Sequence, residues 1–159
     1  HYKTKEIIPM EMVRKIKDSS NFMEGMATLR QLSFARLDMA FHAKDPGSIS
    51  NVKDFEKKAF GDTRLYPDVK NNCMSTAFSH IFQGGYSSGY YSYKWAEVLD
   101  ADAFEAFKEN GIFDKETALK FKDNILSKGA TEKPMDLYVK FRGKEPTPDA
   151  LLKRAGLIN

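Results

Sequence analysis

The chain has 159 residues, which is enough for one domain with a hydrophobic core. Its 42% hydrophobic and 13% aromatic residues exclude a disordered or fibrous protein. The net charge of +3 is small and no stretch approaches the roughly 20 apolar residues that cross a bilayer, so composition supports neither nucleic-acid binding nor membrane insertion.

Proline, glycine and aspartate residues divide the chain into amphipathic helical stretches. In chain order, helices are expected at about residues 9–17, 22–42, 52–60, 87–109, 114–129, 134–142 and 148–156. Residues 62–83 lack helical periodicity and are expected to form a long ordered loop, which in a compact domain is usually functional. No segment alternates as a strand does, so we expect an all-α bundle of about six helices in a single domain, residues 1–159.

Four tyrosines fall within eight residues of the chain. Tyr86, Tyr90 and Tyr93 are spaced i, i+4 and i+7, so on a helix their hydroxyls would lie on one face. Tyr91 and Trp95 would occupy a different face and are expected in the core. The pattern allows a row of phenolic hydrogen-bond donors, although a tyrosine stripe is more often a half-buried packing face.

A histidine and three glycines accompany the tyrosines. His80 is a further neutral donor, and the glycines are suited to a flexible or sharply turned loop that a ligand can approach, at positions Gly84, Gly85 and Gly89. Such a set of donors suits the oxyanion that forms on a peptide carbonyl under attack. A structural histidine and ordinary loop glycines are the alternative, which composition and spacing alone favour.

Two aspartate features have simpler explanations. Asp100 and Asp102 are spaced i, i+2, so they point apart on a helix, and both are expected on a solvated face. Asp38 interrupts an apolar run and is expected to form an ion pair within its helix or with another element.

The pattern FSHIF at residues 78–82, followed by GGY at 84–86 and GYYSYKWAEVL at 89–99, resembles the glycine- and tyrosine-rich loop of the thimet oligopeptidase family. The similarity is strongest to the bacterial peptidyl-dipeptidase and oligopeptidase A branch. It continues in TLRQL, LDM, DADAF and RGKEP, at residues 28–32, 37–39, 100–104 and 142–146. The resemblance implies the C-terminal region of a zinc metallopeptidase.

In that family an HExxH helix and a downstream glutamate hold zinc. His1, His42 and His80 are followed by Tyr, Ala and Ile, so this chain has no HExxH motif and no metal ligand is assigned in it. By resemblance, the third ligand would fall just before residue 1. Zinc is therefore expected in the parent enzyme and not in this chain, which alone would lack the activated water and be inactive.

The resemblance also assigns individual residues. Tyr90 and Tyr93 match tyrosines that donate to the tetrahedral intermediate, and Tyr86 matches a tyrosine that contacts substrate. His80 matches a histidine that helps to hold the substrate backbone or the oxyanion, less securely because the animal enzymes have one residue fewer before the glycine pair. The glycines match the loop that closes on substrate: Gly84, Gly85 and Gly89.

The resemblance implies a metalloendopeptidase or peptidyl-dipeptidase that cleaves short peptides. The expected partners are a peptide substrate and the zinc-bearing N-terminal part of the same protein, without nucleic acid or membrane. The isolated chain could expose an apolar face and self-associate. Its single cysteine suits a reducing compartment, so a cytoplasmic location is expected, with the periplasm as the alternative.

Two rival functions remain open at the level of sequence. A non-catalytic helical interaction module would lack the zinc motif without any truncation. A degenerate family member would have lost its metal site and would only bind peptides. The gene sequence upstream of His1 separates these cases, because the enzyme requires HExxH and a downstream glutamate there.

Overall fold

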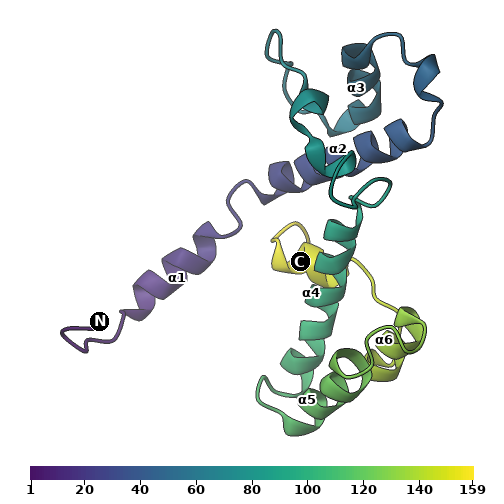
Figure 1. Cartoon of the computed structure of the whole chain (residues 1–159). Helices are drawn as coiled ribbons and strands as arrows, with labels where there is room; N and C mark the ends of the chain where they lie inside the picture. Colours follow the sequence, from purple (N-terminus) through teal and green to yellow (C-terminus); the bar gives the residue numbers. More distant parts are fainter. The chain divides into compact units, whose positions relative to one another are not determined.

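The computed structural model describes all 159 residues and contains helices but no strand (Figure 1). This confirms the all-α prediction. The α-helices are α1 (Met10–Ser19), α2 (Glu24–His42), α3 (Val52–Phe60), α4 (Ser92–Asn110), α5 (Lys115–Phe121), α6 (Pro134–Arg142) and α7 (Asp149–Arg154). None of them combines the length and apolar character that crossing a membrane requires.

The chain forms two compact units, which are described separately below. Unit 1 comprises His1–Tyr91 with Ala155–Leu157, and unit 2 comprises Ser92–Arg154 with Ile158–Asn159. That both belong to a single domain over residues 1–159 stays a prediction.

Local sequence signals explain where several helices begin and end. The side chain of Asn51 accepts a hydrogen bond from the Asp54 N–H at 3.1 Å and so caps the start of α3. Asp114 caps α5 in the same way, through the Thr117 N–H at 2.7 Å. Gly143, at a φ of +82°, follows α6, where the left-handed conformation ends the helix without a Cβ clash.

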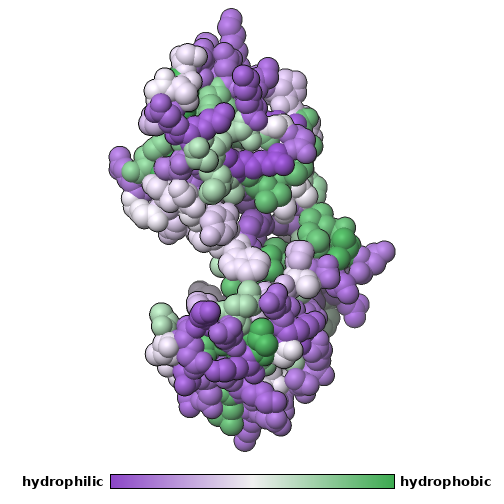
Figure 2. Space-filling model, turned by 90° about the vertical axis from the view of Figure 1, so that its right-hand side faces the viewer, coloured by the Kyte–Doolittle hydropathy of each residue, from purple (hydrophilic) through white to green (hydrophobic).

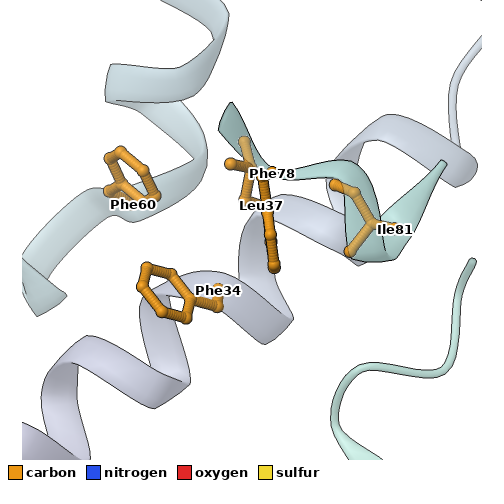
Figure 3. Close-up of a cluster of buried hydrophobic side chains, with 5 residues drawn as sticks. All are labelled: Phe34, Leu37, Phe60, Phe78 and Ile81. Atoms are coloured by element: carbon orange, nitrogen blue, oxygen red, sulfur yellow. The ribbon is translucent and has the colours of Figure 1, made fainter. Parts of the chain in front are cut away.

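The core of unit 1 lies where α3 packs against α2 and where the loop after α3 folds back (Figure 3). Its buried members come from all three segments: Phe34, Leu37, Phe60, Phe78 and Ile81. Burying each of these side chains stabilises the fold by about 1.5–3 kcal/mol. The segment between α3 and the glycine pair is therefore an ordered loop, as expected, because it contributes side chains of its own to the core.

A buried carboxylate holds the middle of that loop. Glu56 on α3 is 5% exposed and accepts hydrogen bonds from the Met74 N–H at 2.9 Å, the Ser75 N–H at 2.8 Å and the Ser75 hydroxyl at 2.6 Å. Burial by itself raises the pKa of Glu56, but the hydrogen bonds from Ser75 and Met74 together outweigh it, and the net pKa is lowered. Glu56 thus links α3 to the loop through its charged carboxylate; we call this set of hydrogen bonds to Met74 and Ser75 the clasp.

We expect Glu56→Gln to destabilise the protein at pH 7 by about 1–3 kcal/mol, because the clasp loses its charge and one acceptor oxygen. Because the folded pKa is lower than the unfolded value, the carboxylate stabilises the fold above the unfolded pKa of 4.5. That contribution disappears as the pH falls through the folded pKa. Urea unfolding of wild type and variant at several pH values from 7 down to about 3 should show the difference shrinking.

Glu11→Gln is the matched control, since the Glu11 side chain is 78% exposed and pairs only with Lys15 on the surface of α1. Its effect should stay below about 1 kcal/mol at every pH. A Glu56→Gln difference that does not change with pH would contradict a charged clasp.

The core of unit 2 forms between α4 and α6, with α7 also packed against α4. Its buried residues are Ala103, Ala106, Tyr138 and Phe141. Phe107 and Phe121 close this cluster with edge-to-face and tilted ring contacts to Phe141. Aromatic residues of α4, α5 and α6 therefore meet in this core.

One acidic residue that was expected in solvent lies inside unit 2. Asp102 is 3% exposed and accepts a 2.7 Å hydrogen bond from the Tyr138 hydroxyl, with Arg142 Nε at 3.4 Å. Burial and the neighbouring Asp102 raise the pKa of Tyr138. Asp100 does point the other way, to an exposed pair with Arg154 at 2.6 Å. The solvated face predicted for Asp102 is wrong because α6 covers that side of α4.

Hydrophobic groups also remain on the surface. Figure 2 shows them in green among hydrophilic residues in purple. The large apolar side chains with the highest exposed fractions include Phe113 at 95%, Ile7 at 90% and Phe22 at 81%. Apolar side chains exposed to this extent are typical of surfaces that another chain or segment covers.

Candidate functional site

The tyrosine-rich segment is not one continuous helix. Helix α4 begins at Ser92, five residues later than predicted, and Ser88 has a φ of +58°. The Gly89 N–H donates to the Tyr86 carbonyl oxygen at 2.9 Å, which makes a turn. Tyr86 and Tyr90 therefore precede the helix, and the prediction that they share one helical face with Tyr93 is wrong.

A buried carboxylate on α2 determines this turn. Asp38 is 0% exposed, and its two oxygens accept the N–H groups of Ser88 and Tyr90, each at 2.9 Å. His42 Nδ1 lies 2.9 Å from Asp38 Oδ1, so the expected partner within the helix is present. Two N–H groups of the segment before α4 donate to the Asp38 carboxylate. They are therefore not bonded to carbonyl oxygens of a preceding helical turn, and the helix begins later.

Tyr90 is held from several sides. Its ring makes edge contacts with Phe34 and Phe78, at centroid distances of 5.9 and 5.0 Å. Its hydroxyl donates to Gln31 Oε1 at 3.3 Å. Burial raises the pKa of Tyr90, so the phenol stays protonated and able to donate at neutral pH.

His80 and Tyr86 come together at the other end of the segment. His80 is exposed in a single turn of 3₁₀ helix, Ser79–Ile81, and its ring centroid lies 6.0 Å from that of Tyr86. The Ser87 hydroxyl donates to the Ile81 carbonyl oxygen at 2.6 Å and ties the two ends together. The structure thus places His80, Tyr86 and Tyr90 in one loop, and their roles in a shared site stay a prediction.

The glycine pair between them faces open space. Gly84 and Gly85 both have a φ of +84°, and a Cβ at either position would meet no atom within 4 Å. This left-handed backbone favours glycine, and the open space leaves room for another molecule beside the chain. Gly89 has no such φ, and its role in a loop that closes on substrate stays a prediction.

Tyr93 lies in unit 2, in the first turn of α4, with 40% of its surface exposed. Tyr91 and Trp95 are 56% and 44% exposed, so the expectation that they belong to the core is wrong. Neighbouring Lys94 and Glu97 form an ion pair at 2.5 Å along the same helix.

A metal ion finds no ligand set in this chain. No group of three or more His, Cys, Asp or Glu side chains lies close enough to hold one. The residues present therefore do not fit a resident zinc ion.

Two features of the site were not foreseen from the sequence: the contacts of Asp38 and Gln31 with the tyrosine segment. A signal for Asp38 existed, since a carboxylate flanked by Leu37 and Met39 within an apolar helix needs a partner. Nothing in the sequence marks Gln31 as a partner of Tyr90.

Comparison with known proteins gives consistent results over nearly the whole chain. The family described as "Peptidase family M3" matches residues 1–157. Oligopeptidase A of Escherichia coli (strain K12) is 43% identical over 162 residues, which cover 99% of this chain and 23% of that protein. Organellar oligopeptidase A, chloroplastic/mitochondrial, of Arabidopsis thaliana is 42% identical over 163 residues, covering 99% and 21%. Dipeptidyl carboxypeptidase of Escherichia coli (strain K12) is 35% identical over 159 residues, covering 99% and 23%.

The chain thus spans less than a quarter of the length of these relatives. Within that span, the resemblance inferred from the glycine- and tyrosine-rich loop is confirmed: the chain belongs to peptidase family M3.

Proposed function

We propose that this chain is part of a zinc-dependent oligopeptidase and supplies hydrogen-bond donors on the substrate side of its active site. The observation that carries the proposal is the family match together with one ordered loop that holds His80, Tyr86 and Tyr90. The named relatives include an oligopeptidase and a dipeptidyl carboxypeptidase, which supports a short peptide as the substrate.

The donors suit the chemistry of peptide cleavage. When a peptide carbonyl is attacked, negative charge develops on its oxygen, and donors already in place stabilise that charge most. Tyr90 and Tyr93 carry phenolic hydroxyls, and His80 is exposed beside Tyr86. In this proposal the two phenols and His80 donate to the oxyanion. Tyr86 and the open backbone at the glycine pair contact the rest of the peptide.

The proposed enzyme needs zinc because its family is in general zinc-dependent. When bound, zinc supplies an activated water at neutral pH. This chain has no HExxH motif, so the zinc ligands would come from another part of the same protein, and the chain alone is expected to be inactive.

The surface supports a partner of that kind. Large apolar side chains are exposed in both units, among them Ile7, Phe22 and Phe113. Contact with the zinc-bearing part would cover such groups, and self-association of the isolated chain would do the same. We propose a cytoplasmic location for the protein, with the periplasm as the alternative.

Assay of the full-length protein tests this function. We expect about one zinc ion per chain and cleavage of a short fluorogenic peptide, lost with a chelator and restored by added zinc. Absence of zinc with retained peptide binding would indicate a degenerate family member. Absence of zinc, cleavage and peptide binding would favour a helical interaction module.

A further inference from the structure

Three residues on one face of α2 contact Tyr90. Gln31, Phe34 and Asp38 are spaced i, i+3 and i+7, so they lie along one side of the helix. Gln31 Oε1 accepts from the Tyr90 hydroxyl, Phe34 meets the ring edge-on, and Asp38 accepts from the backbone N–H. A single helix therefore contacts the backbone N–H, the ring and the hydroxyl of Tyr90.

The ring and the backbone of residue 90 make contacts that do not involve its hydroxyl. A phenylalanine at position 90 would keep the ring contacts with Phe34 and Phe78 and the backbone bond to Asp38. The hydroxyl donates to Gln31 Oε1 over a distance of 3.3 Å, which is long by the usual criteria for a hydrogen bond. A phenol whose ring and backbone are held in place can turn its proton from Gln31 to another acceptor.

We propose that Gln31 and Asp38 are positioning residues that place the Tyr90 hydroxyl for its acceptor in the reaction. This inference rests on the proposed function, because it concerns the donor role of Tyr90. Asp38 sets the backbone position, and Gln31 sets the direction of the hydroxyl. When the phenol proton turns to a substrate oxygen, the Gln31 amide can rotate and donate its N–H to the phenol oxygen. Gln31 can therefore hold the hydroxyl both before and during the reaction.

A double-mutant cycle in the full-length enzyme tests the proposal. Tyr90→Phe should lower kcat by roughly 10²-fold. Gln31→Leu and Asp38→Asn should each lower kcat by about 10-fold with KM changed by less than about 2-fold, because the donor is misplaced rather than removed. In the Tyr90→Phe background the same two substitutions should have little further effect, since the hydroxyl that they position is gone.

Gln31→Glu is a more specific test of Gln31, because a carboxylate accepts a hydrogen bond from the phenol but cannot donate one to it. It should lower kcat at least as much as Gln31→Leu does. Wild-type kcat in Gln31→Glu would overturn the second part of the role given to Gln31.

A purely structural role gives a different result. Gln31→Leu and Asp38→Asn would then lower kcat by the same factor with Tyr90 or Phe at position 90, and that outcome overturns the inference. It leaves the proposed function intact, provided that Tyr90→Phe alone lowers kcat. If Tyr90→Phe has no effect on kcat, the donor role of Tyr90 in the proposed function fails instead.

A second measurement does not depend on activity. With 3-fluorotyrosine at position 90, ¹⁹F NMR should show one sharp resonance for the wild-type surroundings of Tyr90. Asp38→Asn and Gln31→Leu should shift or broaden it, because the ring or the hydroxyl gains additional positions. An unchanged resonance in both variants would overturn the inference whatever the kinetics.

Discussion

Replacing Tyr93 by phenylalanine in the full-length protein is expected to lower kcat by roughly 10²-fold or more, with a smaller effect on KM. The substitution removes one hydroxyl and keeps the ring, so the contacts of the ring at the start of α4 are retained. In the proposed function this hydroxyl donates to charge that develops only during attack on the peptide carbonyl. An interaction made mainly in the transition state appears in kcat rather than in KM.

Steady-state cleavage of a fluorogenic peptide measures the effect. Tyr91→Phe is the matched control, because Tyr91 is an exposed tyrosine two residues away with no role in the proposed mechanism. Its kcat should stay within about 2-fold of wild type, since exposed substitutions of this kind disturb little. Tyr93→Phe with the kcat of wild type would remove Tyr93 from the mechanism.

Several helix boundaries followed from local signals in the sequence, although the expected end near Gly129 is wrong, since α5 ends at Phe121 and a π-helix, Lys122–Leu126, follows it. Helix α3 covers Val52–Phe60, the predicted range, because Asn51 and Gly61 flank it directly in the chain. Helix α6 ends before Gly143 for the same kind of reason. In these cases the residues that set the boundary are the immediate neighbours of the helix, so a sequence pattern is enough to find them.

The start of α4 could not be found in that way. The spacing of Tyr86, Tyr90 and Tyr93 fits a helix, yet Asp38, about fifty residues earlier in the chain, accepts the N–H groups of Ser88 and Tyr90. Periodicity reports local preference, and a buried acceptor from another element outweighs it here. The same limit explains Asp102: it points away from Asp100, as predicted, but its burial depends on α6 and was not predicted.

In the candidate site, the sequence likewise predicted the residues but not the tertiary contacts that support them. Its residues His80, Tyr86 and Tyr90 were assigned through family resemblance, since composition and spacing alone favoured a packing face. The structure places these three in one loop. The supporting contacts from α2 depend on tertiary packing and were visible only as one charged residue within an apolar helix.

That charged residue has the largest expected effect on stability. We expect Asp38→Ala to lower the free energy of unfolding by about 2–4 kcal/mol. The variant leaves the N–H groups of Ser88 and Tyr90 without their acceptor and removes the partner of His42. Unsatisfied backbone donors cost about 1–3 kcal/mol each where water cannot replace the acceptor, and less where it can. Urea unfolding of the wild type and the variant measures the difference.

Asp62→Ala is the control for Asp38→Ala, because it also removes an aspartate that has a side-chain partner in unit 1. The Asp62 side chain is 86% exposed and pairs with Arg36, so its loss should cost less than about 1 kcal/mol. Both substitutions delete one carboxylate and its side-chain partner, so the contrast compares a buried carboxylate that accepts two backbone N–H groups with an exposed one. If the two variants lose equal stability, Asp38 is not the buried anchor of the tyrosine segment. A large loss confined to Asp38→Ala supports a site whose donors are held in place by the packed interior of unit 1.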